Sequence, residues 1–232
     1  MTALPRIFCA IDTNDIDIAI KLSSDVKDYC GIKLGLEFFN GHGIQGVKRI
    51  EDAIGDTPIF LDLKYHDIPN TVAGAIRALT NQISPAFLNV HASGGLEMMK
   101  AAKSECPESS KLLAVTVLTS TDTSCLQSVG QGQDIDSQVK KLALLTQEAG
   151  LDGVVCSSHE IQLIRETCGN DFITMVPGIR PTNSGNHDQK RVMTPEDAIK
   201  LGATHLVIGR PITRAENPVA MARSLFENLS QN

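Results

Sequence analysis

One stretch of the chain runs from an apolar strand pattern straight into a dense set of charges: IFLDLKYHDIPNT, residues 59–71. In a β-strand the side chains at i and i+2 lie on one face, so Asp62 and Lys64 point the same way. Leu61 and Leu63 point to the opposite face. The stretch therefore predicts a buried strand that projects two opposite charges from one face at its end.

A helix is expected directly after these charges. Pro69 suits the first turn of a helix, where its missing N–H costs nothing, and the residues from Val72 onward have helical periodicity. Asp67 then lies in the strand-to-helix turn. A purely structural ion pair is the alternative interpretation of Asp62 and Lys64, but three charges and a histidine within one short run favour a functional role.

Lys64 lies between two carboxylates in the sequence, Asp62 and Asp67. Nearby negative charge favours the ammonium form of a lysine. A Schiff-base lysine, by contrast, needs desolvation or a cationic neighbour. The pattern therefore indicates a proton donor or an electrostatic anchor.

Short apolar, β-branched runs alternate with segments of helical character along the whole chain. The runs are residues 6–12, 31–38, 59–64, 87–91, 112–118, 153–157, 173–179 and 205–211. The helical segments are residues 16–29, 44–54, 72–82, 96–104, 139–149, 159–167, 195–201 and 218–229. Both series have eight members.

This alternation decides the expected fold. Continuously apolar strands separated by helices are typical of a parallel sheet buried on both faces, and eight of each predict an α/β fold, a (β/α)8 TIM barrel that forms one domain over residues 1–232. A doubly wound open sheet is the alternative. It usually carries a glycine-rich turn after the first strand, whereas residues 10–14 here read AIDTN.

Composition limits the classes of function. The 232 residues are 42% hydrophobic, enough for a large core, and the net charge of −6 argues against a nucleic-acid or membrane-surface partner. The six cysteines form no Cys-x-x-Cys pair, the six histidines have no metal-ligand spacing, and no apolar run is long enough to span a bilayer. We expect a cytoplasmic protein without a structural metal.

In a barrel of this type the active site lies at the carboxyl ends of the strands. The polar residues expected there are Asp12, Lys33, Asp62, Lys64, Asn89, His91, Thr119, Arg180 and Arg210. Other roles stay open for some of them: Asp12 could cap the first helix, Lys33 could extend to solvent, and His91 could be a satisfied rim histidine.

The last two strands predict a phosphate site. Gly209 allows close approach of the backbone, and the guanidinium of Arg210 can bind phosphate in a bidentate manner. Residues 181–191 form a long polar segment without periodicity, which suggests either an active-site lid or a solvated insertion.

The stretch DLKYHDIPNT, residues 62–71, resembles the signature of the orotidine 5′-phosphate decarboxylase family. The resemblance covers nearly the whole chain, including IKLG at 32–35, VTVLTS at 115–120, PGIRP at 177–181 and VIGRPI at 207–212. It implies a carbon–carbon lyase that makes UMP in pyrimidine biosynthesis. The fold implied is a homodimeric barrel with no cofactor and no metal, and with sites shared between subunits.

The resemblance also implies residue roles. Lys33, Asp62 and Lys64 would form a charge network, which Asp67 and Thr71 of the neighbouring subunit would complete. Substrate would be held along the remaining rim: ribose by Asp12 and Lys33, pyrimidine by Thr119, base and phosphate by Gln189, and phosphate by Arg180, Gly209 and Arg210.

Two rival functions stay open at this point. Sister barrels such as hexulose-phosphate synthase use a similar strand with Mg²⁺ and present a carboxylate from the second strand, where this chain has Lys33. Glu37, expected on the same face of that strand, keeps this rival open. A non-catalytic phosphate-binding barrel is the other rival, but such a protein has no need of a lysine between carboxylates.

Overall fold

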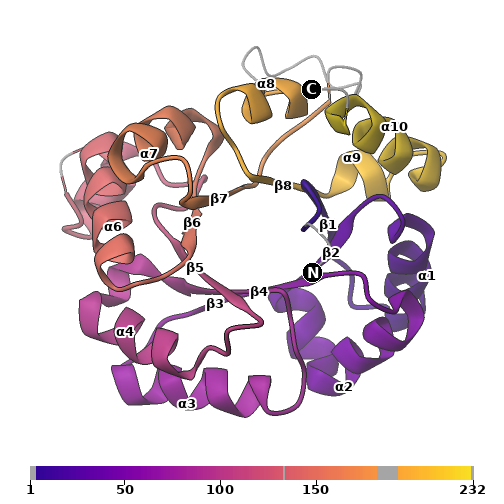
Figure 1. The fold of residues 1–232 in the computed structure, drawn as a ribbon, viewed down its shortest axis with the longest axis horizontal. Coiled ribbons are helices and arrows are strands. Elements are labelled where there is room, and N and C mark those ends of the chain that lie inside the picture. The colour runs from indigo at the N-terminus through magenta and orange to yellow at the C-terminus, as the bar shows by residue number, and fades with distance from the viewer. Residues whose placement is uncertain (1–3, 133, 182–192, 231–232) are drawn as a thin grey trace.

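The computed structural model describes residues 4–132, 134–181 and 193–230 and shows a closed barrel of parallel strands in the order β1 to β8 (Figure 1). Each strand pairs with the next in sequence, and β1 closes the barrel on β8 through Phe8 and Val207. The strands are β1 (Ile7–Ile11), β2 (Gly31–Gly35), β3 (Ile59–Tyr65), β4 (Phe87–His91), β5 (Lys111–Val115), β6 (Gly153–Val155), β7 (Ile173–Val176) and β8 (His205–Ile208). The predicted barrel is confirmed, and the open sheet is excluded.

Helices surround the barrel on its outer side (Figure 1). The α-helices are α1 (Ile16–Val26), α2 (Leu36–Ile54), α3 (Pro69–Thr80), α4 (Leu96–Glu105), α5 (Thr123–Ser128), α6 (Ile135–Glu148), α7 (Ile161–Cys168), α8 (Pro195–Lys200), α9 (Arg210–Thr213) and α10 (Pro218–Ser230). Two short 3-10 helices, η1 (Ala92–Gly94) and η2 (Ser158–Glu160), precede α4 and α7. That residues 1–232 form a single domain stays a prediction.

Strand β2 is shorter than expected, and the segment that follows it is helical. The strand ends at Gly35 and α2 begins at Leu36, with a break at Gly43, where φ is +58°. The prediction that Glu37 lies on the strand face beside Lys33 is therefore wrong: Glu37 is exposed in the first turn of α2. The apolar alternation of Leu34, Leu36 and Phe38 imitates a continuing strand, although Leu36 is half exposed.

Two apolar layers lie on the two sides of the strands. The alternate side chains of each strand that face outward, such as Leu61 and Leu88, join the core beneath the helices. Those that face inward form a second cluster inside the barrel, which includes Phe8, Phe60 and Phe87. These three rings meet edge to face, with centroids 5.4 to 6.2 Å apart, an arrangement that adds about 0.5–1.5 kcal/mol per pair.

The inner cluster closes the barrel below the carboxyl ends of its strands. His205 packs edge to face on Phe8 and Phe87, and its Nδ1 hydrogen-bonds the carbonyl of Pro5 at 2.8 Å. Burial lowers the pKa of His205. The interior of the barrel is therefore filled with side chains at this end, and space for a ligand is left at the other.

In the described part of the chain, none of the helices is both long enough and apolar enough to cross a bilayer.

Candidate active site

Strand β3 brings its charges to the inside of the barrel as its period-2 pattern predicts. Phe60 belongs to the inner apolar cluster, and Asp62 and Lys64 follow on the same face, where they line a cavity. Leu61 and Leu63 point outward into the core beneath the helices. One strand therefore passes from an apolar to an ionic environment within four residues.

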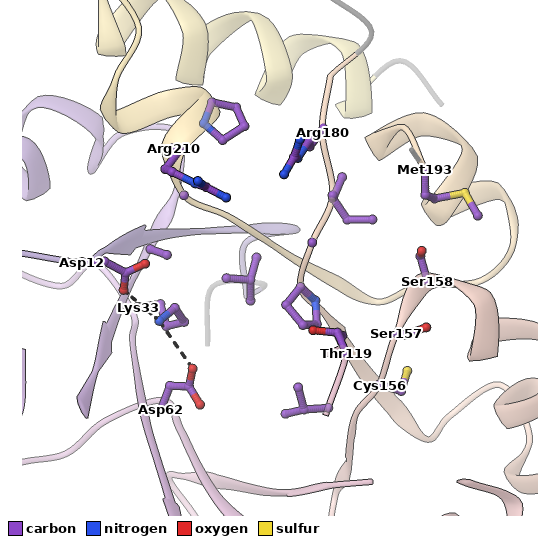
Figure 2. A pocket seen from close by; sticks show the side chains of 18 of the residues that line it. Asp12, Lys33, Asp62, Thr119, Cys156, Ser157, Ser158, Arg180, Met193 and Arg210 are labelled. Carbon is purple, nitrogen blue, oxygen red and sulfur yellow. Dashed lines mark hydrogen bonds and ion pairs between the residues drawn. The ribbon is translucent and has the colours of Figure 1, made fainter. Parts of the chain in front are cut away.

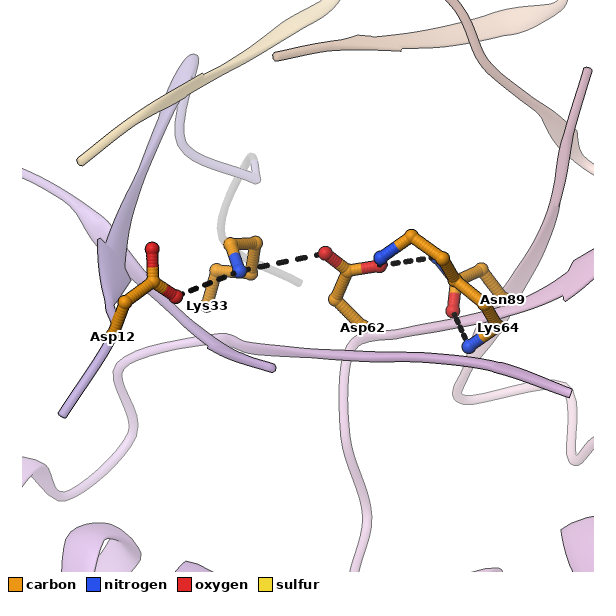
Figure 3. Close-up of polar contacts among 5 residues, drawn as sticks. All are labelled: Asp12, Lys33, Asp62, Lys64 and Asn89. Carbon is orange, nitrogen blue, oxygen red and sulfur yellow. Dashed lines mark hydrogen bonds and ion pairs between the residues drawn. The ribbon is translucent and has the colours of Figure 1, made fainter. Parts of the chain in front are cut away.

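Four charged side chains of alternating sign form a row across β1, β2 and β3 (Figure 3). The Nζ of Lys33 lies 3.4 Å from Asp12 Oδ1 and 3.4 Å from Asp62 Oδ2, and the Nζ of Lys64 lies 2.5 Å from Asp62 Oδ1. The Lys33 and Asp62 side chains are only 9% and 14% exposed. Because each buried charge has an opposite neighbour, the row can persist where an isolated charge could not.

Asp62 is ionised in spite of its burial. Burial by itself would raise the pKa of this carboxyl, but Lys33 and Lys64, with hydrogen bonds from Lys64 and Asn89, outweigh it and hold the pKa below its usual range. The site thus contains a fixed carboxylate between two lysines. Lys64 itself contacts one carboxylate, Asp62, and not the two expected from the sequence, because Asp67 of the same chain is not part of the row.

Lys64 has an unusual backbone conformation. Its φ is +52°, the only positive value among the described residues other than glycine. The pairing of β3 with β4 also shifts at this point, since Leu61 pairs with Leu88 and Tyr65 pairs with Val90. Outliers of this kind cluster at functional sites.

Asn89 on β4 contacts both members of the ion pair. Its Nδ2 donates to Asp62 Oδ1 at 2.7 Å, and its Oδ1 accepts the backbone N–H of Lys64 at 2.7 Å (Figure 3). The sequence placed Asn89 at the end of its strand but gave it no role. The sequence shows only that Asn89 shares the inner strand face of Phe87, two residues earlier; its full burial, which requires hydrogen-bond partners, is known from the structure.

A cavity of about 1130 Å³ opens above this row at the carboxyl ends of the strands. It is slightly larger than the ~300–1,000 Å³ typical of small-molecule sites. Asp12, Lys33, Asp62 and Lys64 line one side, and the other sides come from the ends of β5 to β8. This volume suits a ligand of nucleotide size.

Three arginines line the cavity from the segments after β7 and β8: Arg180, Arg210 and Arg214. Figure 2 shows Arg180 and Arg210 directed toward the same space, on the side away from Asp62. Gly209 caps α9 beside them, and a Cβ there would lie 3.3 Å from the Cβ of Ala10. The backbone N–H of Arg180 donates to the carbonyl of Met193 at 3.2 Å. The cavity thus has a cationic end, as the phosphate prediction requires.

Thr119 lines the cavity wall formed by β5 and β6, together with apolar side chains such as Val117 and Leu118. Figure 2 shows its side chain near the end of β5, directed into the open space. Ser157 and Ser158, which follow β6, add two further hydroxyls to this side of the cavity. The wall thus combines apolar side chains with a few hydroxyls, a surface that suits a flat base with polar edges.

The rings of His66 and His91 lie close to each other, with centroids 5.5 Å apart and their planes tilted by 40°. Burial lowers the pKa of His91, and His66 and Lys64 lower it further. Among the described residues, no three histidine, cysteine, aspartate or glutamate side chains gather in a group able to hold a metal ion.

Comparison with known proteins adds to this geometry. Residues 5–225 match the family described as Orotidine 5'-phosphate decarboxylase / HUMPS family. The chain belongs to this family. A protein named orotidine 5'-phosphate decarboxylase from Rhodospirillum rubrum is 50% identical over 232 residues, covering 96% of this chain and 93% of the relative. One of the same name from Novosphingobium aromaticivorans is 49% identical over 224 residues, covering 96% and 98%.

A solved structure of the same family supports the fold. The crystal structure of orotidine 5'-phosphate decarboxylase from Lactobacillus acidophilus aligns with a TM-score of 0.83 at 35% identity, covering 97% of this chain and 98% of that one. The resemblance inferred from residues 62–71 is therefore confirmed at the level of family and fold.

The structure gathers most of the predicted site residues of this family member around one cavity. Lys33, Asp62, Lys64, Asp12, Thr119, Arg180, Gly209 and Arg210 all line it. Asp67 and Thr71 are exposed at the start of α3 and do not line it, and the carboxylate of Asp67 accepts the N–H of Ile68 at 2.6 Å. Gln189 and the expected lid, residues 181–191, fall outside the described residues except for Pro181.

Proposed function

We propose that the chain decarboxylates orotidine 5′-phosphate to UMP and CO2, the last step of de novo pyrimidine synthesis, without a cofactor. The observation that carries this proposal is the cavity itself. It has a row of alternating charges ending in a lysine on one side, with Lys33 and Asp62 largely buried, and arginines at the other. A nucleotide with a phosphate at the arginines would present its base to Lys64.

The reaction requires positive charge where negative charge develops. As the bond between C6 and the carboxylate breaks, the electron pair stays on C6 of the pyrimidine, which has no obvious electron sink. The ammonium of Lys64, fixed by Asp62 at 2.5 Å, would stabilise that charge and then transfer its proton to C6. Because the ammonium is held in place before the reaction, little reorganisation is needed in the transition state.

Asp62 would also act on the substrate. Its ionised carboxylate would lie opposite the departing carboxylate, and the repulsion between the two would be relieved as CO2 leaves. Catalytic roles thus fall to Lys64, Asp62 and Lys33, with Asp67 from the neighbouring subunit.

The remaining residues would bind the parts of the substrate that do not react. Asp12 and Lys33 would hold the ribose hydroxyls, Thr119 the pyrimidine, and Arg180, Gly209 and Arg210 the phosphate. Gln189 would bridge base and phosphate. Binding energy from the phosphate could then serve to assemble the reacting end of the site.

The proposal is tested by following the loss of orotidine 5′-phosphate spectrophotometrically in the presence of chelator. We expect turnover that is unaffected by EDTA. The sister enzymes that use Mg²⁺ are the second candidate, but the residue that favoured them, Glu37, is on α2 and not on the face of β2. Dependence on added Mg²⁺, or no turnover at all, would contradict the proposal.

We also propose that the active form is a cytoplasmic homodimer with shared sites. Asp67 and Thr71 are exposed and do not line the cavity of their own chain, and Ile68 between them is 66% exposed. A second copy would cover this apolar side chain and receive the two polar ones.

Complementation between two inactive variants tests the shared site. In a co-expressed mixture of Lys64→Ala and Asp67→Ala, each mixed dimer has one site with both defects and one intact site. Random pairing should then restore about a quarter of the wild-type activity. A mixture no more active than its components would refute the sharing of residues between subunits.

A further inference from the structure

We propose that Asn89 is a positioning residue of the active site: its side-chain amide orients the Asp62 carboxylate and holds the backbone of Lys64 in the conformation that directs the ammonium into the cavity. The inference deepens the proposed decarboxylase function and rests on it. Asn89 itself does not line the cavity, so it acts through its two neighbours.

Both ends of the Asn89 amide are engaged by these two contacts. Its side chain is completely buried, and its Nδ2 and Oδ1 each lie 2.7 Å from their partners, Asp62 Oδ1 and the backbone N of Lys64. A carboxylate can only accept and a backbone N–H can only donate, so the partners fix which end of the amide faces which. One planar group therefore sets the relative position of both catalytic residues.

The need for this contact comes from the irregular pairing of β3. Between the pairs Leu61–Leu88 and Tyr65–Val90, β3 contains two more residues than β4. The N–H of Lys64 turns to the side chain of Asn89 in place of a strand carbonyl. This bond satisfies a partly buried donor exactly where φ is +52°, a conformation that an L-residue seldom holds without support.

The contact also fixes the carboxylate. Asp62 Oδ1 accepts from both Lys64 Nζ and Asn89 Nδ2, while Oδ2 faces Lys33 at 3.4 Å. Without the amide, the carboxylate would lose one of its fixed donors and could rotate about its bond. The position of the Lys64 ammonium depends on the Asp62 carboxylate and on the backbone of Lys64. Loss of the Asn89 amide should therefore affect the chemical step more than substrate binding.

The first experiment separates positioning from general stability. Asn89→Ala should lower kcat by about 100-fold, as misplacement of a catalytic group by about 1 Å can do, and should change KM by less than about threefold. The control is Thr146→Val, which removes another fully buried polar group, bonded to the Leu142 carbonyl beneath the helices. Equal losses of kcat in the two variants, or a loss below about threefold in Asn89→Ala, would overturn the inference.

The second experiment uses a variant of nearly identical shape. Asn89→Asp keeps an acceptor for the N–H of Lys64 but places a second carboxyl beside Asp62. At lower pH the carboxyl introduced at position 89 and the carboxyl of Asp62 share one proton. The protonated oxygen at position 89 can then donate a hydrogen bond to Asp62, as the amide did. The ratio of variant to wild-type kcat should therefore rise as the pH falls, by up to about tenfold per pH unit. Parallel pH profiles would contradict the inference.

A crystal structure of the Asn89→Ala variant tests the positioning role of Asn89 independently of the proposed function, because it needs no turnover of substrate. If the wild-type protein does not turn over orotidine 5′-phosphate, the proposed function fails, and the structure alone decides the role of Asn89. We expect Lys64 to relax to negative φ and its contact with Asp62 to lengthen. An unchanged φ and an unchanged contact would overturn the positioning role.

Discussion

The two ends of the barrel interior are built from the same strands but have opposite chemistry. At the lower end Phe8, Phe60 and Phe87 fill the barrel, and two residues later on β3 Asp62 begins the charged row. A step of two residues keeps the side chain on the inner face and moves it about 7 Å along the strand. The comparison teaches that an inward-facing side chain stabilises the barrel or takes part in chemistry according to how far along its strand it lies. Which of the strands carries it matters less.

Ionisable groups at the two ends are controlled by different means. Burial lowers the pKa of His205 at the lower end, where the rings of Phe8 and Phe87 surround it. At the upper end burial would raise the pKa of Asp62, but the two lysines reverse that effect. The lower end therefore favours a neutral group, while the upper end keeps a charge that the reaction can use.

Removing the ammonium at the upper end should have the largest effect on activity. Lys64→Ala takes away both the stabilising charge and the proposed proton donor, so kcat should fall by more than about 1000-fold. UMP affinity, measured by calorimetry, should change little, because the arginine end is intact. A variant with kcat near that of the wild type would remove Lys64 from the mechanism.

At the cationic end of the cavity, Arg210→Ala should cause a smaller loss. Removing a charge-assisted bidentate contact to phosphate should lower kcat/KM by about 10- to 100-fold. Steady-state kinetics and UMP affinity measure the change, and Arg49→Ala, which removes an exposed arginine of α2 outside the cavity, is a matched control. If kcat/KM is unchanged, phosphate does not bind at Arg210.

A substitution at the lower end should reduce stability and spare the chemistry. Phe87→Ala should lower the free energy of unfolding by about 3–5 kcal/mol, because it leaves a cavity among the inner rings. The folded fraction should still turn over substrate, as judged by denaturant unfolding and kinetics on the same sample. Phe87→Leu, which removes less volume, should lower the free energy of unfolding by less. A large loss of kcat with unchanged stability would contradict the separation of a stabilising lower end from a catalytic upper end.

The smallest expected effect is the response of the lower end to acid. The pKa of His205 is lowered from 6.5 in the folded protein, so above that pH both folded and unfolded states are neutral there. As the pH falls below 6.5, the unfolded state takes up the proton first and stability drops, by at most about 1.4 kcal/mol per pH unit. His205→Gln should flatten the Tm profile below pH 6.5. A profile as steep as that of the wild type would exclude this source of acid sensitivity.

The sequence predicts the upper end well where side-chain periodicity decides the outcome. Asp62 and Lys64 share a face because a strand has period two, and alternating apolar runs and helical segments are enough to indicate a closed barrel. The start of α2 was mispredicted because Leu36 and Phe38 continue the apolar alternation of β2 beyond its end at Gly35.

The contacts between strands could not be predicted in the same way. The role of Asn89 depends on the register shift between β3 and β4 and on the positive φ of Lys64, and neither leaves a periodic signal in the chain. The helix α9 was also missed, since its four residues are too few to show a period. Likewise, the exposed position of Asp67 follows from the turn before α3 and not from its sequence distance to Lys64.

The most direct test of the central claim, that the charged row is a cofactor-free decarboxylation site, is release of labelled CO2 from carboxyl-labelled orotidine 5′-phosphate by metal-stripped protein. The account predicts one CO2 per UMP formed by the wild-type protein, with no requirement for added metal, and none above background from Lys64→Ala. Release that requires Mg²⁺, or that persists unchanged in Lys64→Ala, would contradict it.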